Sequence, residues 1–127
     1  MTLQLTTGID LIEIDRIEAA VSRWGERFLH RIYTDGEIAY CRGRVQSLAG
    51  RFAAKEAVSK ALGIGIRSIR WKDIEILPDR RGKPHVTLHG KAATVAETQG
   101  LRGFDISITH SRSDAGAFVV AWGETHP

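Results

Sequence analysis

The sequence is poor in cysteine, in proline and in long apolar runs. Its 127 residues include one cysteine, Cys41, and three prolines. A single cysteine cannot form an internal disulfide and offers no Cys-x-x-Cys pair, which excludes a disulfide scaffold and a thiolate metal site. No run approaches the ~20 apolar residues that span a bilayer, and the first residues lack the basic and apolar regions of a secretory signal. We therefore expect a cytoplasmic protein that does not enter a membrane.

The charge balance is close to even. Eighteen Lys and Arg residues face fifteen Asp and Glu residues, which leaves a net charge of +3. This mild excess suits an acidic partner and does not by itself indicate nucleic acid. Apolar residues make up 43% and charged residues 26%, as in ordinary globular proteins, so disorder and fibrous repeats are excluded. The length predicts one domain over residues 1–127.

The first segment predicts a strand followed by a helix. Apolar residues alternate with acids within Leu3–Ile14, a pattern that is typical of a partly buried strand. Asp15 then predicts a helix N-cap, with Glu18 as its capping-box partner. We expect this first helix to run to about Ile32.

Two more helices are expected in the first half of the chain. Thr34 and Glu37 form a second capping-box signature, which predicts a short helix through Cys41. A longer helix is expected over Ser47–Leu62, and Gly63 is placed to close it.

The second half changes to a period of two. The pattern predicts two strand pairs with an Ala-rich helix between them: Asp73–Leu77 with His85–His89, Phe104–Thr109 with Gly116–Trp122, and the helix Lys91–Gln99. This order of elements predicts an α+β domain with an antiparallel sheet packed with helices. The run around Phe118–Trp122 is apolar on both faces, so we expect an oligomer that buries it.

The first predicted helix presents a basic stripe. At roughly 100° per residue, four arginines fall on one stripe and five apolar residues fall on the adjacent one: Arg16, Arg23, Arg27 and Arg31, beside Ile17, Val21, Trp24, Phe28 and Ile32. Such a helix commonly packs its apolar side into the core and leaves a solvated basic face. The alternative is a docking surface, because a row of arginines creates a directional positive field that attracts an acidic protein.

The longest predicted helix contains residues suited to phosphate chemistry. Phe52, Glu56 and Lys60 are spaced four residues apart and so share one helix face, which Lys55 flanks. One interpretation is a surface ion pair between Glu56 and Lys60 that contributes little stability. The other is a site where a carboxylate, a lysine and Arg51 hold a divalent cation and a polyphosphate together. Magnesium typically takes one or two protein carboxylates, and phosphates and water complete its coordination.

Asp10 is the candidate for a second carboxylate. It interrupts an apolar run in the first predicted strand, where a buried acid without a partner is costly. A hydrogen-bonded core acid and a metal ligand both account for it. His110 and Ser111 end a later strand; a histidine in this position is commonly a surface or packing residue, and catalysis is the second interpretation.

Taken together, three segments resemble one known family. They are Gly8-Ile9-Asp10 with Arg16 following, the run RFAAKEAVSKALG over residues 51–63, and Ser107-Ile108-Thr109-His110-Ser111. In this order and spacing the chain resembles the small bacterial holo-acyl-carrier-protein synthases, the short class of 4′-phosphopantetheinyl transferases. The turn Gly82-Lys83-Pro84 and the closing AGAFVVA segment add to the match, which covers essentially the whole chain. Asp114 stands where members often have an aromatic residue.

The resemblance implies an activity and an assembly. It implies a Mg²⁺-dependent transfer of phosphopantetheine from coenzyme A to a serine of apo acyl carrier protein, in fatty acid biosynthesis, with release of adenosine 3′,5′-bisphosphate. It also implies a homotrimer with active sites between subunits. The carrier proteins of this family are strongly acidic, which favours docking as the role of the arginine stripe.

The resemblance also assigns roles residue by residue. Asp10 and Glu56 match the metal ligands, and catalytic roles fall to Glu56, Lys60 and His110. The residues expected to contact the nucleotide and diphosphate of coenzyme A are Arg51, Lys60, Gly63, Pro84, His110 and Ser111. Arg16 matches the carrier-docking helix, to which helical geometry adds Arg23 and Arg27. The base that takes the serine proton is either Glu56 or a metal-bound water.

Two other classes of function fit the sequence less well. A small basic module that contacts RNA or DNA phosphates would show basic residues interleaved with exposed aromatic residues, whereas the aromatic residues of the first predicted helix fall on its core stripe. A structural subunit without catalysis would have no need for Asp10, Glu56 and Lys60 together. We therefore expect an enzyme that does not bind nucleic acid.

Overall fold

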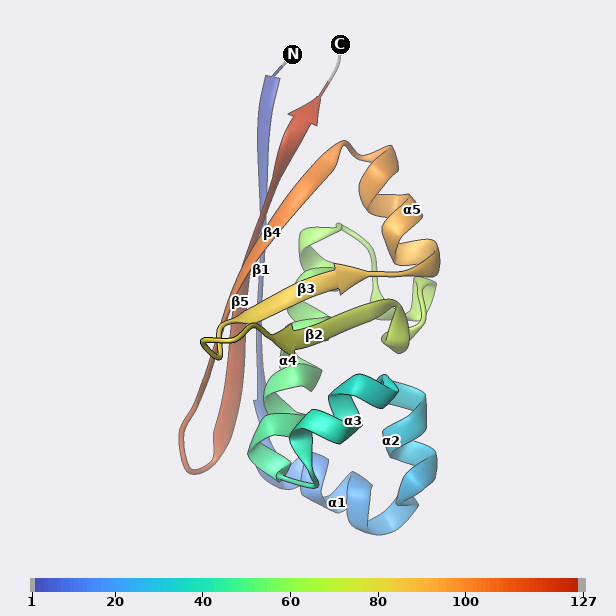
Figure 1. Ribbon diagram of the computed structural model, residues 1–127, viewed down its shortest axis with the longest axis vertical. Helices are drawn as coiled ribbons and strands as arrows, with labels where there is room; N and C mark the ends of the chain where they lie inside the picture. The colour runs from blue at the N-terminus through green and yellow to red at the C-terminus, as the bar shows by residue number, and fades with distance from the viewer. Residues whose placement is uncertain (1, 126–127) are drawn as a thin grey trace.

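The computed structural model describes residues 2–125, which form helices packed against two antiparallel sheets (Figure 1). Its elements in chain order are β1 (Thr2–Glu13), α1 (Ile14–Trp24), α2 (Glu26–Ile32), α3 (Asp35–Cys41), α4 (Val45–Ala61), η1 (Ile66–Ser68), η2 (Trp71–Asp73), β2 (Ile74–Pro78), β3 (Pro84–Leu88), α5 (Gly90–Thr98), β4 (Leu101–His110) and β5 (Asp114–Thr125). The predicted α+β class with antiparallel pairing is confirmed. The strands form two sheets rather than one.

The larger sheet has the strand order β1-β5-β4, so β1 and β4 are its edges. The long helix α4 lies across one face of this sheet (Figure 1). At Gly8 the backbones of β1 and α4 approach so closely that a Cβ atom would lie 1.8 Å from the carbonyl oxygen of Ala57. The α4 residues that lie against Gly8, Ala57 and Ala61, are both buried. The close approach brings side chains of β1 and α4 within reach of each other.

The other face of the same sheet is apolar and exposed. Successive strand residues point to opposite faces, so the odd-numbered residues of β1 point away from α4. The large apolar side chains exposed on β1 and β5 are Leu3, Leu5, Ile9, Leu11, Phe118 and Trp122. The register pairs Ile9 with Phe118 and Leu5 with Trp122, which places these residues on one continuous surface. The run around Phe118 is apolar on both faces, as expected: Val119 and Ala121 are buried, and Phe118 and Trp122 are exposed.

The start of the first helix was predicted wrongly. The helix α1 begins at Ile14, its N-cap residue is Glu13, and no side chain caps it. Asp15 therefore lies inside the first turn, and the capping box with Glu18 does not form. The reason is that β1 continues its pairing with β5 up to Glu13, and the N–H of Ile14 donates to the carbonyl of Ser113 at 2.8 Å.

The predicted single helix to Ile32 is also wrong, because Gly25 divides it. Gly25 has a φ of 55°, a left-handed conformation that a residue without Cβ adopts readily. The chain turns there, and α2 packs against α1 instead of extending it (Figure 1).

Other predicted elements are confirmed. The capping box of Thr34 and Glu37 opens α3: the N–H of Glu37 donates to Thr34 Oγ1 at 3.2 Å, and the N–H of Thr34 donates to Glu37 Oε1 at 2.8 Å. The hairpin β2–β3 forms a separate small sheet, which contacts the large sheet through β3 and β4.

Candidate active site

Asp10 and Lys60 come together at the edge of the large sheet. Asp10 lies on β1 with its side chain on the face that α4 covers, and Lys60 lies in the last turn of α4. The ammonium group of Lys60 is 3.2 Å from Asp10 Oδ1, and it also donates to the carbonyl of Ile9 at 3.0 Å. The Asp10 side chain is 20% exposed and the Lys60 side chain 55% exposed. The pair is thus open to solvent and to a substrate.

Glu56 completes this cluster one helical turn before Lys60. Burial raises the pKa of Glu56, the nearby negative charge of Asp10 raises it further, and the positive charge of Lys60 acts in the opposite direction. The two carboxylates therefore interact electrostatically. Within residues 2–125 the ion pair of Lys60 is with Asp10 and not with Glu56, so a simple surface pair along the helix does not describe this site.

The carboxylates fit a magnesium ion by the chemistry of their oxygen donors. A group of three or more His, Cys, Asp and Glu side chains arranged for a metal is absent from the described part of the chain. A Mg²⁺ ion held by one or two carboxylates and by substrate phosphates needs no such group. Asp10 and Glu56 thus meet the requirement when a diphosphate provides the remaining oxygens.

Arg51 does not join this cluster. It lies on the opposite side of α4 from Glu56 and is buried, and its Nε donates to the carbonyl of Ile76 at 3.2 Å. Its guanidinium carbon lies 4.5 Å from the centre of the Tyr40 ring. The guanidinium group is therefore directed toward α3 and β2, away from Asp10.

His110 and Ser111 lie at the hairpin that joins β4 and β5. Both are exposed, and the Ser111 hydroxyl accepts hydrogen bonds from the N–H groups of Ser113 and Asp114, at 3.3 and 3.1 Å. The carbonyl of Asp114 in turn accepts from the Ser111 N–H at 2.8 Å, so the turn is closed by backbone contacts without an aromatic residue. β4 is separated from β1 by β5, which puts His110 about 10 Å of sheet width away from the Asp10 edge.

Gly63 and Pro84 lie next to different elements of the fold. Gly63 follows α4 just beyond Lys60, with a φ of 73° and its N–H donating to the Lys60 carbonyl at 2.9 Å. Pro84 begins β3, next to Lys83, whose ammonium group is 2.7 Å from Asp105 of β4. The predicted site residues thus form two groups in one chain: one at the β1 edge and the end of α4, and one beside β4 and the small sheet.

The predicted docking residues are exposed, but they belong to two helices. Arg16 and Arg23 lie on α1 and Arg27 lies on α2. The core position predicted for Trp24 is wrong, because 49% of this residue is exposed at the end of α1. The guanidinium carbon of Arg23 lies 4.9 Å from the centre of its ring and that of Arg27 lies 6.0 Å from it. The turn at Gly25 creates this arrangement of an aromatic residue between two arginines.

An apolar cleft lies beside these residues. It has a volume of about 560 Å³ and is lined by residues of α1, α2, α4 and η2, including Trp24, Phe28, Phe52 and Trp71. Phe52 stacks on Trp71 with ring centres 4.6 Å apart, and it precedes Glu56 by one helical turn. Phe52 therefore lies in the cleft, and Glu56 lies on the same face of α4.

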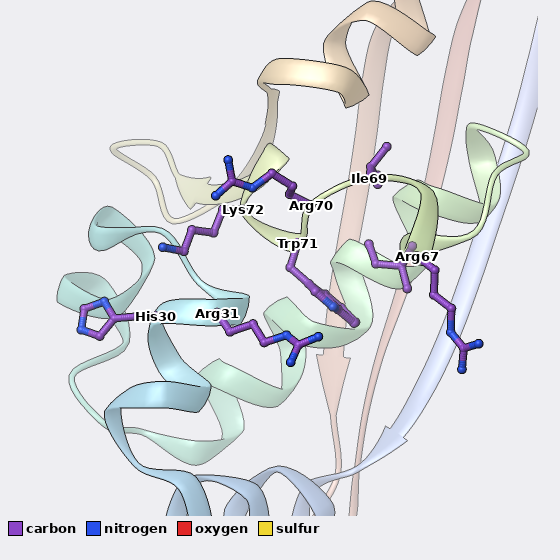
Figure 2. A pocket seen from close by; sticks show the side chains of 8 residues that line it. His30, Arg31, Arg67, Ile69, Arg70, Trp71 and Lys72 are labelled. Carbon is purple, nitrogen blue, oxygen red and sulfur yellow. The ribbon is translucent and has the colours of Figure 1, made fainter.

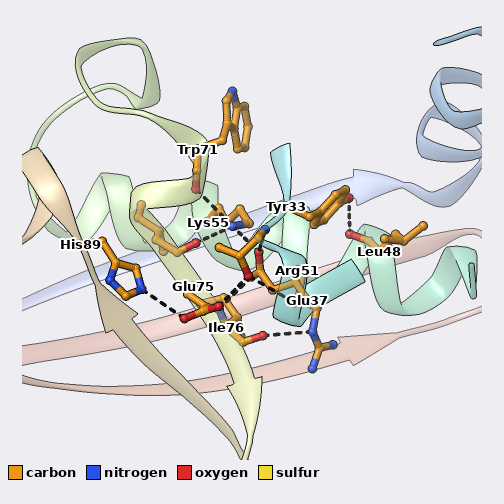
Figure 3. A network of polar contacts seen from close by, with 11 residues as sticks. Tyr33, Glu37, Leu48, Arg51, Lys55, Trp71, Glu75, Ile76 and His89 are labelled. Carbon is orange, nitrogen blue, oxygen red and sulfur yellow. Dashed lines mark hydrogen bonds and ion pairs between the residues drawn. The ribbon is translucent and has the colours of Figure 1, made fainter. Parts of the chain in front are cut away.

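Sequence reasoning missed a buried network on the far side of α4 (Figure 3). The ammonium group of Lys55 lies 2.8 Å from Glu37 Oε1, and both side chains are fully buried. It also donates to the carbonyls of Trp71, at 3.1 Å, and Ile74. Glu37 Oε2 accepts the N–H of Ile76 at 2.8 Å. The sequence feature that could have indicated this network is Lys55, a lysine within an Ala-rich helix. Its contacts give Lys55 a structural role.

None of the helices within residues 2–125 combines the length and the apolar composition needed to cross a membrane.

Known proteins share both the sequence pattern and the fold of this chain. Residues 6–121 match the family model described as the 4′-phosphopantetheinyl transferase superfamily. The holo-[acyl-carrier-protein] synthase of Herpetosiphon aurantiacus is 50% identical, over 94% of this chain and 99% of that protein. The crystal structure of the Helicobacter pylori holo-[acyl-carrier-protein] synthase in complex with coenzyme A superposes with a TM-score of 0.83 at 36% identity, covering 91% of this chain and 98% of that one. The Bacillus anthracis holo-(acyl-carrier-protein) synthase, in complex with CoA (3′,5′-ADP), gives a TM-score of 0.79 at 36% identity and covers 97% of this chain and 100% of that one.

Proposed function

The chain belongs to the 4′-phosphopantetheinyl transferase superfamily, and we propose that it acts there as a holo-acyl-carrier-protein synthase. It transfers the 4′-phosphopantetheine group of coenzyme A to a serine of apo acyl carrier protein and releases adenosine 3′,5′-bisphosphate. The main support for this conclusion is that Asp10, Glu56 and Lys60 lie close together at the edge of the large sheet. Carboxylates beside a lysine are suited to a diphosphate substrate and its cation.

In the reaction the serine oxygen of the carrier forms a bond to the phosphorus of the phosphopantetheine group. The phosphorus–oxygen bond to the adenosine bisphosphate breaks, and the electron pair leaves on that phosphate. The ammonium group of Lys60 offsets the negative charge of the diphosphate and orients it at the end of α4. Asp10 and Glu56 would hold Mg²⁺, which when bound neutralises the diphosphate and stabilises the leaving phosphate.

The serine proton needs an acceptor within this cluster. Glu56 is the group whose pKa is raised, by burial first and by Asp10 second. A raised pKa strengthens a carboxylate as a proton acceptor near neutral pH. Glu56 is one candidate for this acceptor, and a water held by the metal is the other.

We propose that neighbouring subunits complete each site. Arg51, Pro84, His110 and Ser111 lie beside β4 or the small sheet, whereas Asp10 lies at the β1 edge. A cyclic trimer would place one subunit's second group against the first group of the next subunit, because a head-to-tail interface joins unlike surfaces. The exposed apolar face of the large sheet supplies the surface for this assembly.

The carrier protein docks on the surface around Trp24. Arg16, Arg23 and Arg27 are exposed there, and in residues 2–125 no carboxylate lies within 4.0 Å of their guanidinium groups. An acidic carrier would supply the missing negative charge. The adjacent cleft, which Phe52 lines, would receive part of the carrier, and Glu56 follows Phe52 on the same face of α4. We assign the reaction to fatty acid biosynthesis in the cytoplasm, where reducing conditions suit the thiol of coenzyme A and the buried Cys41.

The test is direct. Purified protein is incubated with apo acyl carrier protein, coenzyme A and MgCl₂, and the carrier is weighed by intact-mass spectrometry. We expect a gain of one phosphopantetheine group, no gain with a carrier whose acceptor serine is replaced by alanine, and loss of the reaction in EDTA. If a known family enzyme modifies the same carrier while this protein does not, the proposed function is wrong.

A further inference from the structure

A second cleft, with a basic lining, lies next to the apolar cleft. It runs between α2 and the segment of residues 66–72, and its volume is about 560 Å³ (Figure 2). Its cationic side chains come from separate parts of the chain and are Arg31, Arg67, Arg70 and Lys72. None of the roles proposed above for coenzyme A or the metal uses these residues.

These four cations lack acidic partners. Within residues 2–125 no carboxylate oxygen lies within 4.0 Å of any of them. His30, at the same cleft, has acidic neighbours: it is 2.9 Å from Glu26 and 3.9 Å from Asp35. The positive charges of the four lysine and arginine side chains are therefore not neutralised by the protein, and they are available to an external partner.

The cleft is continuous with the docking surface. Arg31 and Trp71 line both the basic cleft and the apolar cleft beside Trp24. Trp71 is held in place by its stacking on Phe52. A partner seated on α1 and α2 would reach the basic cleft without crossing any other element.

The directions of the side chains distinguish two kinds of ligand. In Figure 2 Arg31 points toward Trp71, Arg70 and Lys72 point to the other side of the cleft, and Arg67 points away at its far end. A small phosphate needs donors that converge on one point, as they do at a phosphate-binding loop. Dispersed cations around an aromatic floor suit an extended acidic protein surface.

We propose that this cleft is a second docking contact for the acidic carrier protein, separate from the arginines of α1. The proposal rests on the proposed function for its partner. The carrier would touch the enzyme at two places: the surface of Arg16, Arg23 and Arg27 around Trp24, and the segment of residues 66–72. The second contact adds affinity and fixes the rotation of the carrier about the first, so that its serine faces Glu56.

The test compares two double charge reversals. Arg67→Glu with Arg70→Glu alters exposed residues of the cleft, and Arg80→Glu with Arg81→Glu changes the net charge equally at the exposed β2–β3 turn. Binding of fluorescently labelled apo carrier is measured by anisotropy without coenzyme A, and transfer is measured separately for each protein. We expect the cleft variant to bind the carrier about tenfold more weakly, as two reversed surface charges predict, and the control to stay within about twofold.

The outcomes separate the two proposals. Equal carrier affinity in the cleft variant and the wild type, with normal wild-type transfer, overturns the cleft proposal alone. A wild type that binds the carrier but does not modify it overturns the proposed function and leaves the cleft contact standing if the cleft variant binds more weakly. Binding of inorganic pyrophosphate that the cleft variant loses, with carrier affinity unchanged, shows a small-anion site instead and also overturns the proposal.

Discussion

Replacing Lys55 by methionine is expected to destabilise the fold severely without affecting the chemistry. Lys55 and Glu37 are both fully buried, and the ammonium group makes contacts with three acceptors: Glu37, Trp71 and Ile74 (Figure 3). Methionine has nearly the same volume, so packing is kept while the charge is lost. Glu37 would then be a buried charge without its counter-ion, and the two carbonyls would lose a donor.

The magnitude follows from this change. Burial lowers the pKa of Lys55, and the Glu37 carboxylate opposes that shift, so each charge depends on the other in the folded state. Breaking a buried pair by removing one partner costs about 3–5 kcal/mol. Total stabilities of single domains are about 5–15 kcal/mol, so a large share would be lost. For a chain of this length the melting temperature should fall by roughly 10–20 °C.

The assay is chemical and thermal denaturation at matched protein concentration, since assembly would couple stability to concentration. Lys60→Met is the matched control, because it makes the same substitution on the same helix at a side chain that is 55% exposed. That variant should unfold within about 1 kcal/mol of the wild type and lose transfer activity. Lys55→Met should keep its activity at temperatures where it remains folded.

A double variant tests the cause. Glu37→Gln combined with Lys55→Met removes both charges, so it should be more stable than Lys55→Met alone. A loss of less than about 1 kcal/mol for Lys55→Met, or a folded Lys55→Met protein without activity, would refute the structural role assigned to this pair.

Four further outcomes are expected. Glu56→Gln should lower the transfer rate by at least about a hundredfold at saturating Mg²⁺, with an unchanged circular dichroism spectrum; near-normal turnover would remove Glu56 from the site. Arg23→Glu should raise the KM for the carrier several-fold and leave the KM for coenzyme A unchanged, and the carrier KM of the wild type should rise with salt, as both substrate titrations will show. Ile9→Glu with Phe118→Glu should dissociate the assembly in sedimentation experiments, and an intact trimer in that variant would contradict the proposed interface. Gly8→Ala should destabilise the fold by about 3 kcal/mol in urea titrations, because its Cβ atom would meet the Ala57 carbonyl; wild-type stability would show that β1 and α4 can separate.

The features that could be predicted depend on neighbours in the chain. The capping box of Thr34 and Glu37 involves residues three apart, and both of its hydrogen bonds form as predicted. Glu56 and Lys60 were placed on one helix face by their spacing, and the alternation in β1 and β5 predicted strands. In each case the relevant geometry is fixed by a single helix or strand, so a local pattern is enough.

Contacts between segments that are far apart in the sequence could not be predicted from local patterns. Asp10 and Lys60 are fifty residues apart, so no local pattern places them together, and the packing of α4 on β1 brings them into contact. The Lys55–Glu37 pair depends on β2 as well, since Ile76 donates to Glu37 from 39 residues away. The exposure of Trp24 depends on the turn at Gly25, and Arg51 is directed away from Asp10 because it packs against Tyr40. These outcomes were decided by tertiary packing, because burial determines which charges need a partner and only the folded chain determines which residues are buried.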